Sequence, residues 1–401
     1  MSQSAYIPYG QWWSTPFARW QGSLATLHAI KLGAHVARQH LQRVGLDASI
    51  FDFGVLGTTV PQKGAFYGLP WLMGEIGAES VAGPTIAQAC ATGARSLAVA
   101  TDEITRGDAS VALVVAADRV SNGPQIYYPD PTGPGGSGER EAWVLDNFAR
   151  DPFAAVAMIQ TAENVASAHG ITGHEQNDLT LRRYEQYSDA LKNDAAFLRG
   201  FMPLPFDVPD AKFRKQIGKM MGDEGIQQTT AAGLAALKPV LSGGTVTYGG
   251  QTHPADGNAG MVVATRERAA ELSRNTSVAV QVVSFGQARV ERAHMPMAPV
   301  PAAQRALKAA GVSIDQIAAI KTHNPFIVND LYFARHMGVD AGRMNNYGCS
   351  LVWGHPQAPT GLRSVIELIE ELVLIGGGYG LFTGCAAGDS AMAVVLKVGD
   401  A

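Results

Sequence analysis

A cysteine in the first quarter of the chain lies where a nucleophile could be activated. Cys90 follows a largely apolar stretch and precedes a small-residue segment that predicts a helix over 89–107. At a helix N-terminus, unpaired backbone N–H groups and the helix dipole favour a thiolate over a thiol. The neighbours Ala91, Gly93 and Ala94 are small enough to admit an acyl group beside the sulfur. Taken alone, such a cysteine is more often a buried structural thiol.

A histidine between two glycines is a candidate partner for this thiol. His355 lies in the segment Gly354-His355-Pro356, directly before a predicted helix over 356–371. Proline is favoured in the first turn of a helix, so the pattern predicts that His355 lies at an exposed turn. A neutral imidazole at that place could take the proton from a nearby thiol. Outside such a motif, a lone histidine more often only satisfies local hydrogen bonds.

Two further candidates lie at the ends of predicted strands. Cys385 ends the strand 381–385 and is followed by small residues at a turn. Its thiol could act as a general acid and base toward a carbon leaving group, and the backbone N–H groups beside it could face an oxyanion. His323 follows the strand 318–322 and could donate a hydrogen bond to a carbonyl oxygen, directly or through water, and Asn324 could do so instead. The simpler interpretations are a core thiol and a polar pair that satisfies a turn.

The elements that must position these residues alternate between strands and helices along the chain. This alternation predicts an α/β protein with mainly parallel sheets. The valine-rich run 111–117 is apolar throughout, as expected of a strand buried on both faces. Near the end of the chain, 278–284 and 318–322 predict strands, and 381–385 with 391–397 predicts a hairpin. We therefore expect two similar α/β halves.

A region of different composition separates these halves. Pro and Gly are so frequent in 121–138 that we expect no regular element there, and 201–219 is also expected to be irregular. Between them, 163–169 and 174–194 predict polar helices. The inserted region of about a hundred residues has the size of a small domain. Insertions of this kind often cover a site that the core builds.

The expected domain organisation therefore has three parts. They are an N-terminal half with Cys90 over 1–120, an inserted loop domain over 121–250, and the remaining core with the C-terminal half, which carries His323, His355 and Cys385, over 251–401.

The composition excludes several classes of protein. The 401 residues carry a net charge of −4, which gives no general attraction to nucleic acid or to an anionic membrane. Three cysteines do not make a disulfide framework in so long a chain, and neither they nor the histidines show a metal-binding spacing. We expect no signal peptide, and no apolar run approaches the ~20 residues that span a bilayer. The expected compartment is the reducing cytoplasm, with no nucleic acid, membrane or metal bound by this chain.

Taken in order, these segments resemble the thiolase family over nearly the whole chain. The Cys90 segment is similar to the family's nucleophile segment, and Gly354-His355-Pro356 is similar to its Gly-His-Pro block. Cys385 falls where thiolases place their acid/base cysteine. The block His323 to Phe326 occupies the place of the family's Asn-Glu-Ala-Phe block, in which several branches put His first. The resemblance implies a layered α-β-α-β-α fold of two similar halves with an inserted loop domain that binds coenzyme A.

Two blocks in the middle of the chain agree with this resemblance. The segment 161–166 is similar to the start of the family's coenzyme A-binding loop domain, and 244–247 with Asp256-Gly257 matches another thiolase block in length. This alignment places Thr252 at a serine that contacts coenzyme A in relatives. Ketoacyl synthases, the nearest competing class, are not expected to carry these two blocks.

The chain also departs from the family pattern. The glycine-rich run after the second cysteine is replaced, so we expect the backbone N–H of Ala387 or Gly388, together with that of Cys90, to form an oxyanion site. Cys349 stands where relatives usually have glycine, and we interpret it as structural. The loop 123–138, with Tyr127 and Tyr128, is unusual and is expected to shape a pocket for a bulky acyl group.

The resemblance implies thiolytic cleavage of a 3-oxoacyl-CoA through an acyl-Cys90 intermediate, with His355, Cys385 and His323 as the other catalytic residues. Coenzyme A is then a substrate, and no tightly bound cofactor is expected. A condensing thiolase uses the same residues in the reverse direction. A thiolase-like retro-aldolase is a further alternative, but it needs no nucleophilic cysteine. A non-enzymatic lipid carrier is the alternative from a different class of protein.

A narrower resemblance concerns the N-terminus. The segments 5–10 and 14–23 are similar to the thiolase subunit of benzoylsuccinyl-CoA thiolases, which form benzoyl-CoA and succinyl-CoA. Members of that group pair with a small zinc-finger/OB-type subunit, to which any zinc would then belong. Thiolases are generally symmetric oligomers, so a homodimeric core is the expectation.

Overall fold

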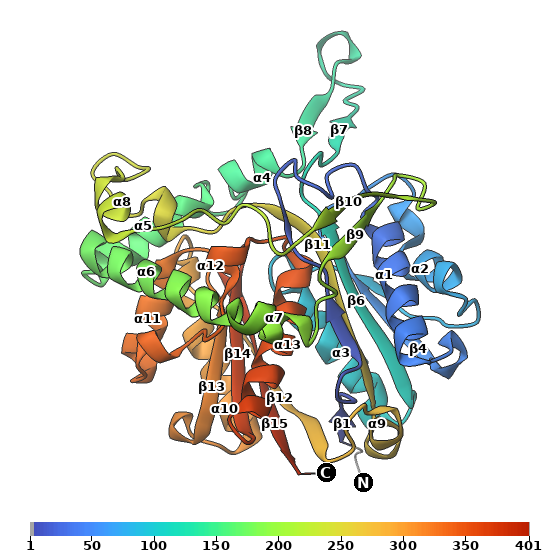
Figure 1. Ribbon diagram of the computed structural model, residues 1–401. Helices are drawn as coiled ribbons and strands as arrows, with labels where there is room; N and C mark the ends of the chain where they lie inside the picture. Colours follow the sequence, from blue (N-terminus) through green and yellow to red (C-terminus); the bar gives the residue numbers. More distant parts are fainter. Residues whose placement is uncertain (1–3, 401) are drawn as a thin grey trace.

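Two half-sheets with a layer of helices between them form the core of the computed structural model, which describes residues 4–400 (Figure 1). The first half-sheet contains β1 (Ala5–Tyr6), β4 (Phe53–Gly57), β5 (Thr85–Ile86), β6 (Val111–Arg119) and β11 (Ala255–Thr265). The second contains β12 (Val278–Arg289), β13 (Ile317–His323), β14 (Gly378–Ala386) and β15 (Ser390–Asp400). Hydrogen bonds between β1 and β12 join the two into one continuous path, and the short strands β2 (Trp12–Ser14) and β3 (Ala18–Arg19) pair with β11.

The two half-sheets repeat one topology. The order β1-β11-β6-β4 in the first corresponds to β12-β15-β14-β13 in the second. In each, parallel pairing (β4 with β5 and β6, β13 with β14) is followed by antiparallel neighbours. The predicted pair of similar halves is thus confirmed. The expectation of mainly parallel sheets is wrong, because the last two strands of each half are antiparallel neighbours. In the second half, β14 and β15 form a hairpin; in the first half, the inserted region separates β6 from β11.

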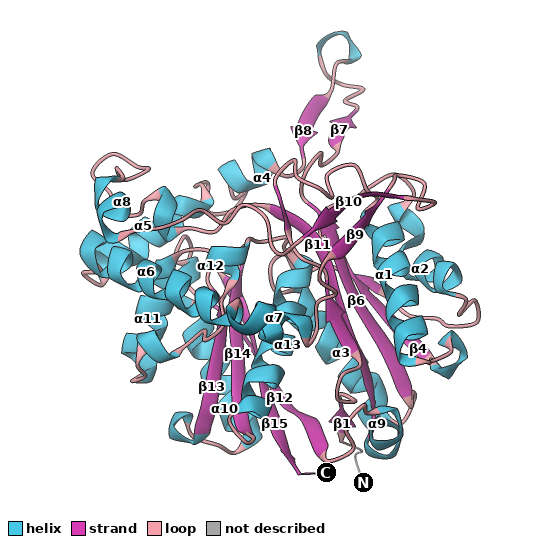
Figure 2. Cartoon of the chain, viewed as in Figure 1, coloured by secondary structure: helices cyan, strands magenta, loops and turns pink. Residues whose placement is uncertain are grey.

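Helices complete the α-β-α-β-α layering (Figure 2). The central layer holds α3 (Thr92–Arg106) and α13 (Ala358–Leu374), which contact both half-sheets. The outer layers are α1 (Ala29–Val44), α2 (Gly68–Ile76) and α9 (Arg266–Leu272) on the first half, and α10 (Pro299–Ala310) with α11 (Ile327–Met337) on the second. Among the described residues, no helix is long and apolar enough to cross a membrane.

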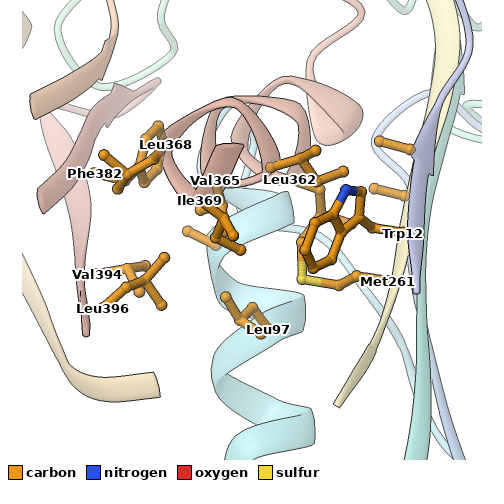
Figure 3. Packing of buried hydrophobic residues seen from close by; sticks show 14 of the residues in the cluster. Trp12, Leu97, Met261, Leu362, Val365, Leu368, Ile369, Phe382, Val394 and Leu396 are labelled. Carbon is orange, nitrogen blue, oxygen red and sulfur yellow. The ribbon is translucent and has the colours of Figure 1, made fainter. Parts of the chain in front are cut away.

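The helix α13 is buried on nearly all sides, and α3 is buried on its inner face, because a sheet covers each flank. In Figure 3, Leu97 of α3 and Leu362 of α13 lie between Trp12 and Met261 on one side and Phe382 on the other. Burying each such side chain contributes about 1.5–3 kcal/mol. The sequence of α13 is not apolar all round, but its charged residues Arg363 and Glu367 are buried as a pair, with Nε of Arg363 3.0 Å from Oε1 of Glu367.

Glycines let the two central helices approach closely. A Cβ added to Gly93 would lie 2.6 Å from the carbonyl oxygen of Ala358 and 2.7 Å from the backbone nitrogen of Leu362. A Cβ on Gly361 would lie 3.1 Å from the nitrogen of Ala94. Because the crossing is at the first turn of both helices, it also brings together the loops that precede them.

The inserted region contains more regular structure than expected. Its helices are α4 (Leu145–Ala149), α5 (Met158–Ala168), α6 (Gly173–Ala190), α7 (Lys192–Arg199) and α8 (Ala231–Ala236), of which α5 and α6 correspond to the predicted polar helices. The prediction of no regular element is wrong in two places, where β7 (Gln125–Tyr128) pairs with β8 (Glu139–Ala142) and β9 (Phe206–Pro209) pairs with β10 (Gln216–Met220). The Pro and Gly residues lie mainly at the tip of the β7–β8 hairpin, which projects away from the core (Figure 1).

A buried ion pair ties the inserted region to α13. Both guanidinium NH groups of Arg363 donate to Asp223, at 2.6 and 2.8 Å, and both side chains are fully buried. The guanidinium also stacks over the rings of Trp353 and Phe17, at 4.3 and 4.7 Å from their centroids. This bidentate contact holds the inserted region against the end of the core that carries the candidate site.

Candidate active site

Cys90 and His355 lie in corresponding loops, each directly before one of the two central helices. Cys90 precedes α3 by two residues and His355 precedes α13 by three. Ala89, before the cysteine, has φ +44°, and Gln357, after the histidine, has φ +61°. A non-glycine residue with a positive φ is strained, and such strain persists where the surrounding contacts fix a functional loop.

His355 is buried, so the predicted exposed turn is wrong. Its side chain is only 6% exposed because the segment 251–255 covers it. The N–H of His355 donates to the carbonyl of His253 at 2.8 Å, and its carbonyl accepts from the N–H of Ala255 at 3.4 Å. The Nδ1 atom is 2.7 Å from Oγ1 of Thr360 on α13, and Nε2 is buried without a hydrogen-bond partner.

His323 is likewise held by a hydroxyl group. It ends β13 and is almost fully buried, with Nδ1 2.8 Å from Oγ of Ser350 at the start of the short helix α12 (Ser350–Trp353). Its Nε2 is also buried without a partner. The rings of His323 and His355 stack at 4.1 Å between centroids, with 28° between their planes. A hydroxyl group therefore holds Nδ1 of each ring, and Nε2 of each ring is left to interact with a substrate or with Cys90.

Tertiary structure brings Cys90 to this histidine pair. Sγ of Cys90 and one ring nitrogen each of His323 and His355 all lie within 4.8 Å of one another. The backbone N–H groups of Ala387 and of Cys90 itself face Sγ of Cys90, and both lower its pKa. Of the two expected oxyanion donors, Ala387 is therefore the one that faces the sulfur.

The protonation state of Cys90 differs from the sequence-based expectation. Burial raises the pKa of its thiol to about 11, and this effect exceeds the lowering by the two N–H groups. The expectation that a helix N-terminus favours the thiolate is therefore wrong for the ligand-free protein. Burial also lowers the pKa of His323 to about 3 and lowers that of His355 well below its ordinary value, with further lowering from His323. The site thus rests as a neutral thiol beside two neutral imidazoles.

Cys385 lies beside Cys90 at the end of β14, and its neighbour Asn329 was not found from the sequence. Nδ2 of Asn329, on α11, donates to Sγ of Cys385 at 3.2 Å. Burial raises the pKa of Cys385 well above its ordinary value, and proximity to Cys90 raises it further, whereas the Asn329 hydrogen bond lowers it. An asparagine within a helix gives no local signal in the sequence, because only the packing of α11 on β14 brings it to the thiol.

Asn324, the alternative to His323, points away from the site. Its side chain donates to Asp330 at 2.7 Å and to Cys349 at 3.3 Å, and its oxygen accepts from Ser350 and Leu351 at 3.1 Å. All of its polar groups are therefore used in holding the loops around the site. Cys349 is buried in this network, in agreement with a structural role.

A buried carboxylate positions the loop that carries His355. Asp118, at the end of β6, accepts hydrogen bonds from the N–H of Ala358 at 3.0 Å and from the N–H groups of Thr59 and Val60 at 2.8 and 3.0 Å. Burial raises its pKa to about 6 despite these donors. Because Ala358 is the first residue of α13, Asp118 links the N-terminal half to the start of this helix.

A cavity of about 850 Å³ opens onto Cys90 and His355. Thr252, the expected coenzyme A contact, lies in its wall, where its N–H donates to the carbonyl of Pro325 at 2.8 Å. Tyr127 and Tyr128 are not part of the lining, so the expectation that they shape the pocket is wrong; both lie half-exposed on the projecting hairpin. The large apolar lining side chains come instead from α4, α5 and the loops around the site: Trp143, Phe148, Met158, Ile159, Met295 and Phe326.

The lining of this cavity is uncharged. Within residues 4–400 it includes no Lys, Arg, Asp or Glu. Its polar groups are mainly side-chain amides, hydroxyls and imidazoles, including Asn147, Gln227, Gln251 and Gln357. A large apolar cavity with a few convergent polar groups is typical of a small-molecule site. Together with the thiols and imidazoles, it can support covalent transfer of an apolar acyl group.

Known proteins share this arrangement of sequence and fold. The thiolase N-terminal domain model matches residues 12–267, and the thiolase C-terminal domain model matches 276–398. The chain is 30% identical over 397 residues to an acetyl-CoA acetyltransferase of Pseudomonas aeruginosa, covering 95% of this chain and 96% of that protein. It is 29% identical over 390 residues to that of Escherichia coli, covering 96% of each.

Solved structures agree. The crystal structure of the human mitochondrial 3-ketoacyl-CoA thiolase in complex with CoA has a TM-score of 0.88 at 25% identity, covering 98% of each chain. The Bacillus anthracis acetyl-CoA acetyltransferase has a TM-score of 0.90 at 23% identity, covering 99% of each, and supports the fold alone. The chain belongs to the thiolase family, a family of acyltransferases.

Proposed function

We propose that this protein is a thiolase that cleaves a 3-oxoacyl-CoA with a bulky, apolar acyl group, using coenzyme A as the second substrate and no tightly bound cofactor. The observation that carries the proposal is the cluster of Cys90, His323, His355 and Cys385 at the end of a large apolar cavity. The named relatives support the reaction class, since they are acetyl-CoA acetyltransferases and 3-ketoacyl-CoA thiolases.

In the proposed first half-reaction, substrate binding excludes water and His355 accepts the Cys90 proton. The thiolate attacks the 3-oxo carbon, and the N–H groups of Cys90 and Ala387 stabilise the tetrahedral oxyanion. Removing one such donor typically costs about 10²–10³ in rate. The bond to the α-carbon then breaks, and the imidazoles of His323 and His355 hydrogen-bond the enolate oxygen.

Cys385 acts as an acid at the end of the first half-reaction and as a base in the second. Its raised pKa keeps the thiol protonated until the carbanion needs a proton. The resulting Cys385 thiolate takes the proton of an incoming coenzyme A, whose sulfur attacks the acyl-Cys90 thioester. The new acyl-CoA leaves, Cys90 takes back the proton held by His355, and Cys385 keeps the proton from coenzyme A, so both cysteines return to their thiol forms.

For the acyl group, we propose an aromatic ring among the apolar side chains from 143–159. Trp143 is held firmly, with Nε1 donating to the carbonyl of Thr59 at 2.9 Å, and both Trp143 and Phe148 pack against a small buried cluster of valines. The uncharged lining fits a benzoyl group better than it fits the carboxylate of a benzoylsuccinyl substrate, which would need amide donors such as Asn147. Benzoylsuccinyl-CoA remains the named candidate, with the homodimeric core and a small partner subunit as part of that proposal.

The test is to incubate the protein with a panel of 3-oxoacyl-CoAs, from acetoacetyl-CoA to benzoylsuccinyl-CoA, and to identify the adduct on the Cys90 peptide by mass spectrometry. A benzoyl adduct supports the aromatic specificity, whereas acetyl transfer alone contradicts it. The Cys90→Ala variant should lose turnover by more than about 10³-fold, since the covalent route disappears. Near-normal thiolysis by this variant would contradict the thiolase mechanism and favour a retro-aldolase. The same residues also serve condensation, which is measured with the product thioesters.

A further inference from the structure

Cys90, His323 and His355 come from three separate parts of the sequence but present three soft or borderline ligand atoms to one point. Sγ of Cys90 and a nitrogen of each ring lie within 4.8 Å of one another. Both histidines are buried, and Nε2 of each has no hydrogen-bond partner. Buried polar atoms without partners are uncommon, so this pair calls for a ligand.

We propose that these three side chains bind a thiophilic divalent transition-metal ion, of which Zn²⁺ is the best match, and that this ion reversibly inhibits the enzyme. A thiolate and two neutral imidazoles form a donor set that suits Zn²⁺ in tetrahedral geometry. Three protein ligands leave the fourth position open, and here it faces the cavity, where water can fill it. The inhibition rests on the proposed function, because the ion would block the nucleophile Cys90. Binding of the ion does not depend on the proposed function.

The groups behind the histidines resemble those that orient metal ligands. Nδ1 of His323 is 2.8 Å from Oγ of Ser350, and Nδ1 of His355 is 2.7 Å from Oγ1 of Thr360. A hydroxyl can accept from Nδ1–H as well as donate to Nδ1, so each ring can take the tautomer in which Nε2 carries the lone pair when a metal ion binds. Both rings are thereby prepared to act as ligands through Nε2.

Binding requires a small local adjustment. In a tetrahedral site with these bond lengths the ligand atoms are about 3.5 Å apart, so atoms up to 4.8 Å apart must close by about 1 Å. The stacked rings must also splay from their present 28°. The Cys90 proton leaves to solvent as the metal–sulfur bond forms, because a coordinating thiol is deprotonated. No oxidant or reductant takes part.

Cobalt(II) reports the ligand set directly, because a Co²⁺–thiolate bond gives a charge-transfer absorption band. We expect the wild-type protein to bind one Co²⁺ per chain with this band, and Zn²⁺ to displace it. His323→Asn and Cys90→Ser should each weaken Zn²⁺ binding by more than about 10-fold, since loss even of an outer-shell partner costs about 10–100-fold. The matched control is His336→Asn, which removes a histidine that stacks on Tyr332 outside the cavity.

A measurement on the wild type covers the case in which a variant does not fold. Zn²⁺ should protect Cys90 from iodoacetamide, as read from its peptide by mass spectrometry, and EDTA should restore both alkylation and thiolysis. Absence of the thiolate band, or unchanged Zn²⁺ affinity in folded His323→Asn, would overturn the inference and assign any bound ion to surface imidazoles. If Co²⁺ binds as expected but the panel of 3-oxoacyl-CoAs shows no turnover, the proposed function fails and the metal site stands.

Discussion

The rings of His323 and His355 stack face to face, 4.1 Å apart, although His323 ends β13 and His355 lies in the loop before α13. Each ring is tied by one nitrogen to a hydroxyl group, and both residues are almost fully buried. Two imidazolium ions could not share this space, because their like charges would repel without solvent to screen them. Burial also lowers the pKa of each imidazole and raises that of the Cys90 thiol, so all three groups are neutral in the absence of substrate.

The first prediction concerns the pH dependence of Cys90 alkylation. Because burial raises the thiol pKa to about 11, the thiolate fraction should grow about tenfold per pH unit from neutrality toward that value. Iodoacetamide alkylation of the Cys90 peptide, followed by mass spectrometry at a series of pH values, should rise without a plateau near neutral pH. A plateau there would show a preformed thiolate–imidazolium pair with His355 and would contradict the neutral resting state.

The second prediction concerns the crossing of the central helices. Gly93→Ala places a Cβ 2.6 Å from the carbonyl oxygen of Ala358, so the backbone of α3 or α13 must move and separate Cys90 from His355. We expect turnover to fall by about 10²-fold, as a misplacement of about 1 Å can cost that much. Thermal unfolding should also shift downward. The control is Gly74→Ala in α2, where nothing lies within 4 Å of the added Cβ; it should keep full activity.

The third prediction concerns Asn329 as a positioning residue for Cys385. Its donated hydrogen bond favours the thiolate, so Asn329→Ala should raise the pKa of Cys385 further and shift the pH dependence of coenzyme A deprotonation upward. We expect kcat to fall by about tenfold with little change in KM, a part of the 10²–10⁴-fold typical of general acid–base catalysis. Exchange of product α-protons with solvent deuterium measures the Cys385 step separately. An unchanged pH profile would indicate only a packing role, and Asn275→Ala at an exposed position is the control.

The fourth prediction concerns acyl specificity. Replacing Trp143 or Phe148 with Ala removes apolar surface from the cavity wall. If the acyl group binds there, kcat/KM should fall about 10–100-fold for an aromatic 3-oxoacyl-CoA, and only a few-fold for acetoacetyl-CoA. Tyr127→Ala, on the projecting hairpin, should leave the ratio of the two substrates unchanged. Equal losses for both substrates would place the acyl group elsewhere.

The sequence alone determined the layered fold class and the segments that carry the chemistry. Continuous apolar runs such as 111–117 require burial on both faces, and short motifs such as Gly354-His355-Pro356 keep their local form wherever they fold. Periodicity is a property of neighbouring residues, which is why the buried strands and central helices could be predicted. Strand direction could not, since it depends on which distant strand each one meets.

Only the tertiary structure decided how the site works. The hydrogen bond of Asn329 to Cys385, the hydroxyl groups behind both histidines and the convergence of three ligand atoms at Cys90 join segments far apart in the chain. The sequence predicted a reactive thiolate at a helix N-terminus, whereas burial by the surrounding layers keeps Cys90 protonated. Helix termini are local and visible in sequence, but desolvation sums over every element packed around a group, and it outweighs the local effect here.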